Sequence, residues 1–288
     1  MPELPEAETI VRGLLAPLHD RRVTQVTVVR PDVVEGSATR FADALTGRVM
    51  QEVGRRGKNV VIHLDDDARL VVNLGMSGRL LYRPPSDPSP PPTHPVAEFH
   101  LSRGDDGEGG TLVYHDIRRF GLLRVLDARA YGRWSRSLGP EPLGRRFTAR
   151  YLQEACAASR SPLRSWLLDQ RKVAGVGNIY ANEAAHLAGI HPRTPASAIP
   201  AQAIPRLHRA IRRVLRDAIE ARGTTLRDYR TAQGWEGSYG GALRVYGRDG
   251  EPCPGCRTPV EREVFGNRSA FFCPTCQPAP DAPRRSPP

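Results

Sequence analysis

The chain has 288 residues, 39% of them hydrophobic and 25% charged, which is the composition of a globular protein with one or two domains. No stretch is apolar enough to span a bilayer and no basic-then-apolar leader opens the chain, so we exclude a membrane-spanning class and expect a cytoplasmic location. The formal net charge of +11 favours a polyanionic partner, of which nucleic acid is the commonest.

The N-terminal half predicts one helix followed by β-strands. Apolar residues recur at helical spacing over 5–18, and the segments that follow alternate or form short apolar runs. The predicted strands cover 23–29, 59–74 (a hairpin around an acidic turn), 97–102, 111–116 and 121–126, with a Gly/Asp-rich turn between the third and the fourth. Residues 84–95 contain seven prolines, so we expect an extended surface loop there.

The first residues, MPELPEAET, allow two interpretations. Removal of Met1 would leave Pro2 with a free secondary amine, and an α-amino group titrates at about pH 8, so part of it is unprotonated at neutral pH. Such an amine can attack an aldehyde-level carbon and form a Schiff base, while Glu3 moves protons. The alternative is a plain helix entry, in which Pro5 suits the first helical position.

Two glycine-bounded turns carry large apolar residues beside arginines. LGMSGRL (74–80) contains Met76, and HDIRRFGLL (115–123) contains Phe120. Such side chains are usually buried in a core, but apolar side chains on loops beside arginines also insert between stacked bases. The residues alone are compatible with both interpretations.

The C-terminal half predicts helices over 148–159, 162–171, 179–188 and 202–222. We expect a tight turn at Gly175 and Gly177, with Asn178 capping the next helix. Backbone N–H groups at such a helix start can bind a DNA phosphate, although an ordinary helical hairpin has the same pattern.

Four of the five cysteines form two pairs with metal-site spacing, namely Cys253, Cys256, Cys273 and Cys276. In a chain expected in the cytoplasm, two Cys-x-x-Cys pairs predict a metal site rather than disulfides. Four thiolates complete the tetrahedral shell of one Zn²⁺, so the predicted site is structural and closed. Cys156 stands alone in a helical pattern, and we expect a buried thiol.

The whole sequence resembles the formamidopyrimidine-DNA glycosylase family, bacterial base-excision enzymes for oxidised purines. The resemblance rests on PELPEAET, RRGKNV, LGMSG, RRFG, LGPEPL, AGVGNIYANE, AGIHP, GTTLRDY, VYGRDGEPC and the cysteine pairs, in this order along nearly the whole chain. It implies an α+β fold with an N-terminal two-layer β-sandwich and flanking helices over 1–130, a helix-two-turn-helix domain over 131–242 and a zinc finger over 243–277. The tail, 278–288, is expected to be disordered.

The resemblance also implies the chemistry of several residues. Pro2 would attack C1′ of the damaged nucleotide, and Glu3 would donate and accept protons at the sugar. Lys58 would support β-elimination and touch a phosphate, and Arg268 would bind phosphate and assist δ-elimination. A further set would contact DNA: Met76, Arg118 and Phe120 would fill the gap left by the flipped base, and His94, Arg164 and Asn178 would lie at phosphates.

Four residues depart from the family pattern. Asn73 stands where a histidine often precedes LGMSG, and Ile117 replaces a usual proline. Trp235 and Ser238 stand where a lysine and a tyrosine are expected, in the segment 231–243 that aligns with the loop capping a flipped oxidised guanine. These departures leave the preferred lesion open.

Three functions are therefore weighed. The first is a bifunctional glycosylase and apurinic/apyrimidinic lyase for oxidised purines, with duplex DNA as partner, one structural Zn²⁺ and a monomeric chain. The second resembles endonuclease VIII, which prefers oxidised pyrimidines. The third is a non-catalytic zinc-ribbon DNA-binding protein, which would not need Pro2, Glu3, Lys58 and Arg268 as a set.

Overall fold

The computed structural model describes residues 2–103, 109–226 and 229–280 of the chain. The chain divides into two compact units, Met1–Ser137 with Ala218–Gly240, and Leu138–Asp217 with Gly241–Pro288. The centre of the predicted Gly/Asp-rich turn (104–108) and the last part of the predicted tail (281–288) lie outside the described residues. The domain boundaries at 130, 242 and 277 remain predictions.

The first unit contains most of the strands. Its elements are α1 (Leu4–Leu18), β1 (Arg21–Val28), α2 (Ala38–Asp43), β2 (Val49–Arg56), β3 (Asn59–Leu64), β4 (Arg69–Asn73), β5 (Gly78–Arg83), β6 (Pro95–Leu101), β7 (Gly110–Asp116), β8 (Leu122–Leu126) and α3 (Ala128–Ser137). Among the described residues the strands pair in the order β5-β7-β6-β1-β2-β3-β4-β8, all antiparallel.

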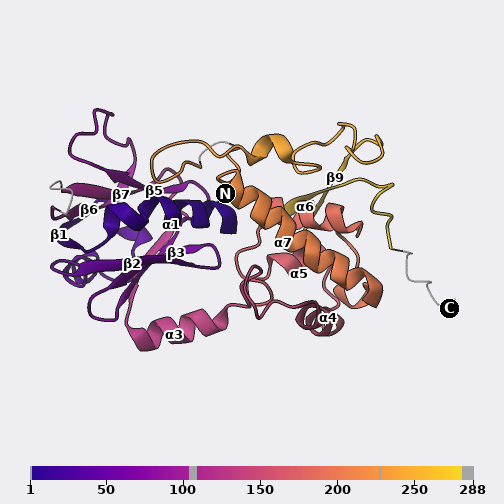
Figure 1. Ribbon diagram of the computed structural model, residues 1–288, viewed down its shortest axis with the longest axis horizontal. Coiled ribbons are helices and arrows are strands. Elements are labelled where there is room, and N and C mark those ends of the chain that lie inside the picture. Colours follow the sequence, from indigo (N-terminus) through magenta and orange to yellow (C-terminus); the bar gives the residue numbers. More distant parts are fainter. Residues whose placement is uncertain (1, 104–108, 227–228, 281–288) are drawn as a thin grey trace. The chain divides into compact units, whose positions relative to one another are not determined.

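Strand β1 belongs to both halves of this sheet. Arg21 and Arg22 pair with β2, whereas Val23–Val28 pair with β6. The two halves thus form two layers, and Figure 1 shows β5, β6 and β7 on one side of α1 and β2 and β3 on the other. Leu14 and Leu18 of α1 are fully buried in the core that both layers share. The α+β class with a two-layer sandwich is therefore confirmed.

The second unit contains most of the helices and the cysteine pairs. Its elements are α4 (Ala149–Ala157), α5 (Leu163–Leu168), α6 (Asn178–Ala188), most of α7 (Ile204–Glu220), β9 (Glu261–Phe265) and β10 (Arg268–Phe272). The apolar face predicted for α7 is buried, as is the Cys156 thiol of α4. No helix among the described residues combines the length and the apolar content that crossing a membrane requires.

Two expectations about the turn between α5 and α6 are wrong. Helix α5 ends at Leu168 rather than near 171, because the Asp169 carboxylate accepts hydrogen bonds from the backbone N–H and the guanidinium of Arg171. The cap of α6 is Gly177, and Asn178 is the first helical residue. The Asn178 side chain is therefore available for contacts with other segments.

Candidate active site and metal centre

The start of α1 is buried and held from two directions. Pro2 is buried, Glu3 is 1% exposed, and Glu3 forms a capping box with Glu6. The Glu6 carboxylate accepts from the Glu3 backbone N–H at 2.8 Å and from the Thr224 backbone N–H at 2.8 Å. A chain end held in this way does not fray as most termini do. Sequence reasoning missed Glu6, although a Glu-x-x-Glu spacing before an apolar helix indicates such a box.

Lys58 lies in the two-residue turn between β2 and β3, at the position expected for it. The turn is anchored by Arg55, whose guanidinium donates to the Gly57 carbonyl at 2.6 Å and to the Glu8 carboxylate at 3.0 Å. Burial opposes ionisation of Glu8, but the hydrogen bonds from Arg55 and Arg12 outweigh it and hold the pKa of Glu8 below its usual value. Helix α1 and the turn carrying Lys58 are thereby joined.

Two asparagines link the Lys58 turn to the Met76 loop. The Asn59 amide donates to the Arg56 carbonyl at 3.0 Å, and the Asn73 amide donates to Asn59 Oδ1 at 2.8 Å. Asn73 Oδ1 in turn accepts from the Gly75 backbone N–H at 3.0 Å. Asn73, which departs from the family pattern, thus belongs to a series of side-chain hydrogen bonds that connects the Lys58 turn with the Met76 loop.

Asp116 gathers the loops of Met76 and Phe120. Its buried carboxylate accepts from the Ser77 hydroxyl at 2.6 Å, the Gly121 backbone N–H at 2.9 Å and the Tyr114 hydroxyl at 3.2 Å. Burial, with Asp116 adding to it, raises the pKa of Tyr114, so the phenol stays a donor. This carboxylate went unnoticed in the sequence, where it stands at the end of a predicted strand.

The three predicted gap-filling residues lie together. Arg118 Nη1 is 3.9 Å from the Met76 sulfur, and the Phe120 side chain is 63% exposed. The loops meet closely at Gly75, which has φ +57°, and a Cβ there would lie 2.4 Å from the Phe120 carbonyl carbon. A glycine is therefore required at this contact.

His94 ends the proline-rich loop and lines a pocket. Its ring packs edge-on against buried His115, with 5.6 Å between the ring centroids. Burial, and next the charges of Arg79 and His94, lower the pKa of His115. The pocket beside His94, about 620 Å³, is also lined by Arg30 and Arg119. The Asp116 carboxylate also lines this pocket, and Arg119 forms an ion pair with Asp32 at 2.9 Å, so the lining carries charges of both signs.

In the second unit, buried Arg164 holds Asn178 and the β9–β10 turn. Its guanidinium donates to Asn178 Oδ1 at 2.8 Å, to the Arg268 carbonyl at 3.3 Å and to the Phe265 carbonyl. The Asn178 amide donates to the Ser269 carbonyl at 3.0 Å. Arg164 is 1% exposed, so its predicted phosphate contact remains a prediction, whereas Arg268 is exposed beside it.

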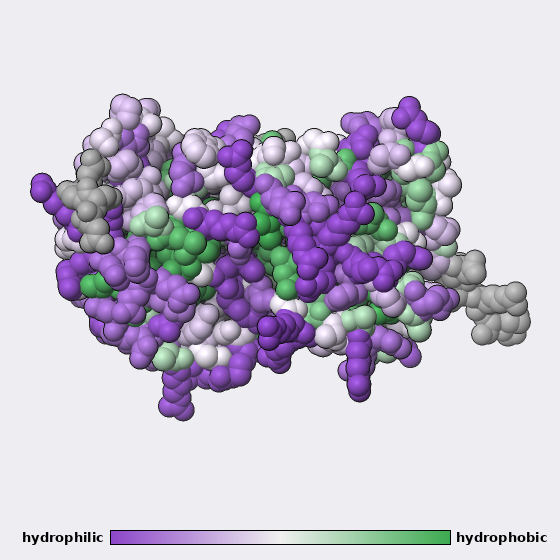
Figure 2. Space-filling model, viewed as in Figure 1, coloured by the Kyte–Doolittle hydropathy of each residue, from purple (hydrophilic) through white to green (hydrophobic). Residues whose placement is uncertain are grey.

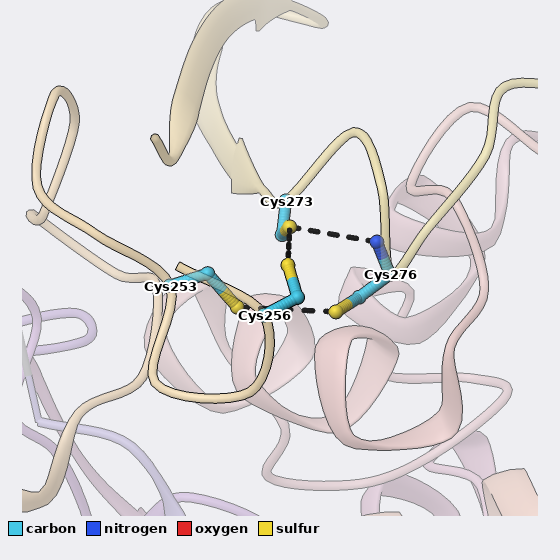
Figure 3. Close-up of side chains that lie close together, drawn as sticks. All are labelled: Cys253, Cys256, Cys273 and Cys276. Atoms are coloured by element: carbon cyan, nitrogen blue, oxygen red, sulfur yellow. Dashed lines mark hydrogen bonds between the residues drawn. The ribbon is translucent and has the colours of Figure 1, made fainter. Parts of the chain in front are cut away.

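The four cysteines lie together at the C-terminal hairpin (Figure 3). Their Sγ atoms all lie within 4.8 Å of one another, with 3.3 Å between Cys256 and Cys273 and 3.9 Å between Cys253 and Cys276. Zn–S bonds of about 2.3 Å at tetrahedral corners put the sulfurs about 3.8 Å apart, so the four residues fit one Zn²⁺. Backbone N–H groups of Gly255 and Cys276 point at the sulfurs of Cys253 and Cys273, at 3.4 Å each.

Helix α6 supports this metal centre with two residues that the sequence did not reveal. The Glu183 carboxylate accepts from the backbone N–H groups of residues 244, 245 and 246 at 2.8–3.0 Å, which holds the segment leading to the finger. His186 Nε2 lies 3.4 Å from Cys253 Sγ. Asn178, which contacts the β9–β10 hairpin, and His186, which lies beside the four cysteines, thus stand on one helix.

The loop with the two altered residues belongs to the first unit. Trp235 is 60% exposed, and the guanidinium carbon of Arg222 lies 5.8 Å from its ring centroid. The loop is closed by a hydrogen bond from the Thr231 N–H to the Trp235 carbonyl at 2.8 Å, and tied to α1 by Gln233, which donates to the Gly13 carbonyl at 2.9 Å. Trp235 is therefore an exposed aromatic on an ordered loop.

A basic chain with a cluster of four cysteines and an exposed phenylalanine beside arginines has the features of the zinc-containing DNA-binding proteins. Comparison with known proteins identifies the family within this class. Residues 1–123 match the formamidopyrimidine-DNA glycosylase N-terminal domain, 138–230 match the formamidopyrimidine-DNA glycosylase H2TH domain, and 250–279 match the zinc finger found in FPG and IleRS.

Full-length relatives agree. The chain is 41% identical to the formamidopyrimidine-DNA glycosylase of Chloroflexus aurantiacus (96% of this chain, 98% of the relative) and 45% identical to that of Rhizorhabdus wittichii (96% and 100%). It matches Lactococcus lactis Fpg in complex with abasic-site DNA with a TM-score of 0.88 at 29% identity, covering 96% of this chain and 100% of the other. The chain therefore belongs to the formamidopyrimidine-DNA glycosylase family, the DNA glycosylases that carry this zinc finger.

Proposed function

We propose that this glycosylase excises oxidised purines, namely 8-oxoguanine and formamidopyrimidines, through a Schiff base at Pro2 and then cleaves the strand by β- and δ-elimination. The observation that carries the proposal is the buried Pro2-Glu3 start, which the Glu6 carboxylate holds at both the Glu3 and the Thr224 backbone. In support, a variant of Lactococcus lactis Fpg, a structural relative at 30% identity, has been solved in complex with DNA containing Fapy-dG.

The proposed chemistry begins with removal of Met1. The Pro2 nitrogen forms a bond to C1′ while the bond from C1′ to the base breaks, and the base leaves with a proton. Opening of the sugar ring, with Glu3 supplying the proton to the ring oxygen and the Pro2 nitrogen having lost its own proton, gives a cationic Schiff base (an iminium ion). Loss of a 2′ proton then expels the 3′ phosphate, and a second elimination expels the 5′ phosphate.

The phosphate-binding roles fall to half-buried Lys58 and exposed Arg268, which stand on turns held by other residues. Lys58 stands on the turn that the two asparagines and Arg55 anchor, and Arg268 stands on the turn that Arg164 anchors. We expect Lys58 to assist the first elimination and Arg268 the second, because each leaving phosphate carries a charge that a cation stabilises.

The remaining contacts concern the duplex. Met76, Arg118 and Phe120 would occupy the gap left by the flipped nucleotide, because an unfilled gap costs a few kcal/mol of lost stacking, about the value of base unstacking. His94, Asn178 and Arg164 would lie at or behind phosphates. We further propose that the protein acts as a monomer in the cytoplasm, on double-stranded DNA with oxidised bases or abasic sites.

Oxidised pyrimidines are the second candidate substrate class. Trp235 and Ser238 change the loop that bears on lesion choice, and a Lactococcus lactis Fpg complex with oxidised-pyrimidine DNA matches this chain with a TM-score of 0.86 at 30% identity. An exposed tryptophan stacks on any base, so it favours a broader range of lesions.

Borohydride trapping tests the proposal. Duplexes carrying 8-oxoguanine opposite cytosine, or thymine glycol, are incubated with protein and reduced, and the adduct is located by peptide mass analysis. We expect an adduct at residue 2 on the 8-oxoguanine duplex, and Glu3→Gln to slow its formation without abolishing DNA binding. An adduct only on thymine glycol selects the second candidate. No adduct on either duplex, with Met1 removed and DNA bound, overturns the enzyme assignment in favour of a binding protein.

A further inference from the structure

Helix α3 is attached to the first unit without contributing to its core. None of its ten residues is buried. Arg56 donates to the Ser135 hydroxyl at 3.1 Å and to its carbonyl at 2.9 Å, and the Arg69 guanidinium lies 5.8 Å from the Tyr131 ring centroid. Its position is therefore fixed by polar and aromatic contacts on one face, and core packing does not explain its sequence.

The opposite face carries a basic stripe. Arg129, Arg133 and Arg136 are all exposed, and at 100° per residue they fall within an arc of about 60°. Tyr131 and Ser135 lie on the far side of the same helix. At a rise of about 1.5 Å per residue the stripe is about 10 Å long. Figure 2 shows hydrophilic side chains extending from the edge of the molecule where α3 lies in Figure 1.

The helix itself supplies no carboxylate to neutralise the stripe. Residues 128–137 contain no acidic residue, and the Asp127 carboxylate accepts from the Ala130 backbone N–H at 2.6 Å. In the part of the chain that the structure describes, no ion pair joins Arg129, Arg133 or Arg136 to an acid. Like charges at these spacings repel and destabilise a helix.

Two exposed arginines of other helices differ in this respect, although exposed Arg209 and Arg216 of α7 have no ion pair among the described residues. Arg150 forms an ion pair with Glu154 at 2.8 Å on α4, and Arg213 forms one with Asp217 at 3.6 Å on α7. Their charges are thus offset within one helical turn, whereas the charges of the α3 stripe are left for a partner.

We propose that the α3 stripe is an additional DNA-binding surface, which holds the phosphate backbone of duplex DNA through Arg129, Arg133 and Arg136. A length of about 10 Å spans about three phosphates, which lie about 3.4 Å apart along the axis of one strand. Guanidinium groups bind phosphate oxygens in bidentate fashion, and such contacts carry no sequence information. The inference rests on the proposed function only in taking DNA as the polyanion.

The salt dependence of binding to undamaged duplex measures the contacts directly. Each phosphate contact contributes about 0.9 to the slope of log affinity against log salt concentration. Replacing all three residues (Arg129→Gln, Arg133→Gln, Arg136→Gln) should lower the slope by about 2–3 and weaken binding at least about tenfold at about 0.1 M salt. An unchanged slope overturns the proposal. Circular dichroism and melting verify that the variant is folded.

Two double variants that remove the same amount of charge distinguish direct phosphate contacts of the stripe from a general effect of net charge. Arg129→Gln with Arg133→Gln and Arg150→Gln with Arg213→Gln each remove two exposed helical arginines. The first pair should lower the slope by about 2, the second by much less. Equal losses overturn the proposal, since net charge would then suffice.

Two further measurements identify the partner of the stripe and distinguish failure of this proposal from failure of the proposed Pro2 chemistry. At saturating protein, borohydride trapping should be the same in the triple variant and the wild type; absence of trapping in both would refute the Pro2 chemistry and leave the slope interpretable. Vesicles of phosphatidylserine and phosphatidylcholine test the other polyanion. Vesicle binding that depends on the stripe, with an unchanged DNA slope, overturns the proposal in favour of a membrane surface.

Discussion

The two units present their predicted DNA contacts by opposite electrostatic means. In the first, the buried Asp116 carboxylate gathers the Met76 and Phe120 loops by accepting from hydroxyl and N–H groups. In the second, the buried Arg164 guanidinium gathers Asn178 and the Arg268 turn by donating to an amide oxygen and to carbonyls. In these contacts a buried charge is satisfied by dipoles, and each charge fixes two segments far apart in the sequence.

The two units differ in which contacts would remain if the buried charged residue, Asp116 or Arg164, were replaced. Without Asp116, donors on two short loops remain, and both loops still belong to a sheet with a large core. Without Arg164, the Asn178 amide and a two-residue turn lose their common partner, and that turn belongs to a two-stranded hairpin next to the metal centre. We therefore expect the second unit to be the more fragile.

Removal of Zn²⁺ should have the largest effect. The small core around the cysteines consists of residues such as Val245, Val260 and Phe271, and structural zinc binding supplies about 10 kcal/mol or more of folding free energy in zinc-finger peptides. Chelation should unfold the finger and abolish strand cleavage, while the first unit keeps its structure. Amide hydrogen exchange measured before and after chelation checks this. Equal loss of protection in β3 and β10 would show that the units unfold together.

His186→Phe sharpens the zinc prediction. If the His186 N–H donates to the Cys253 thiolate, its loss should speed transfer of Zn²⁺ to a chromogenic chelator several-fold, because neighbouring hydrogen bonds orient metal ligands. His186→Gln, which keeps a donor, is the matched control. Equal release from the wild type and both variants would contradict a role for this hydrogen bond.

Replacement of Arg164 should come next. Arg164→Met leaves the Asn178 oxygen and two carbonyls without their donor, at a cost of about 2–4 kcal/mol in unfolding free energy. δ-Elimination should fall more than β-elimination, because Arg268 loses its support. Denaturant unfolding and gel analysis of the cleavage products measure the two effects, and Arg164→Lys should restore part of each. A proportional fall in both eliminations would argue against this link to Arg268.

Asp116→Asn should lower the unfolding free energy by less than Arg164→Met, about 1–3 kcal/mol. One side-chain oxygen still accepts hydrogen bonds, while the new amide group faces a donor. The loops of Met76 and Phe120 should loosen, so trapping on a lesion duplex should slow while trapping on an abasic site, which needs no base release, is nearly retained. Ser77→Ala, which removes one donor to the same carboxylate, is the milder control. Equal slowing on both substrates would contradict a role in holding the flipped nucleotide.

The Glu8–Arg55 pair should give the smallest effect. The pKa of Glu8 is below its usual 4.5 in the folded protein, so its stabilisation is present above that value and is lost as the pH falls through the folded pKa. Glu8→Gln should lower stability at pH 7 by about 1 kcal/mol or less, because the pair is partly exposed. Wild type and variant should converge once the pH lies below the folded pKa of Glu8, and unfolding at several pH values measures this. A constant difference would mean that packing, not charge, is lost.

Local sequence patterns predicted most of the secondary structure, but few of the long-range hydrogen bonds that hold the site residues in place. Helix α1, six of the eight strands of the first unit and the cysteine pairs have short-range patterns, and they were predicted, whereas β2 and β5 were not. Helix α3 was missed because Gly132, the serines and the arginines leave no apolar stripe. The contacts of Arg164 with residues 265 and 268, or of Glu6 with 224, join segments that no local pattern connects, so only the folded chain reveals them.

The hydrogen bond between Glu6 and Thr224 also orders events during synthesis. Pro2 is among the first residues to leave the ribosome, and Thr224 follows more than two hundred residues later. A nascent or truncated chain that ends before Thr224 has the Pro2 amine but lacks one of the two hydrogen bonds that hold the Glu6 carboxylate in place. The proposed nucleophile is thus synthesised long before the residue that helps to hold it, and we expect Pro2 to reach its final position only after Thr224 has been translated.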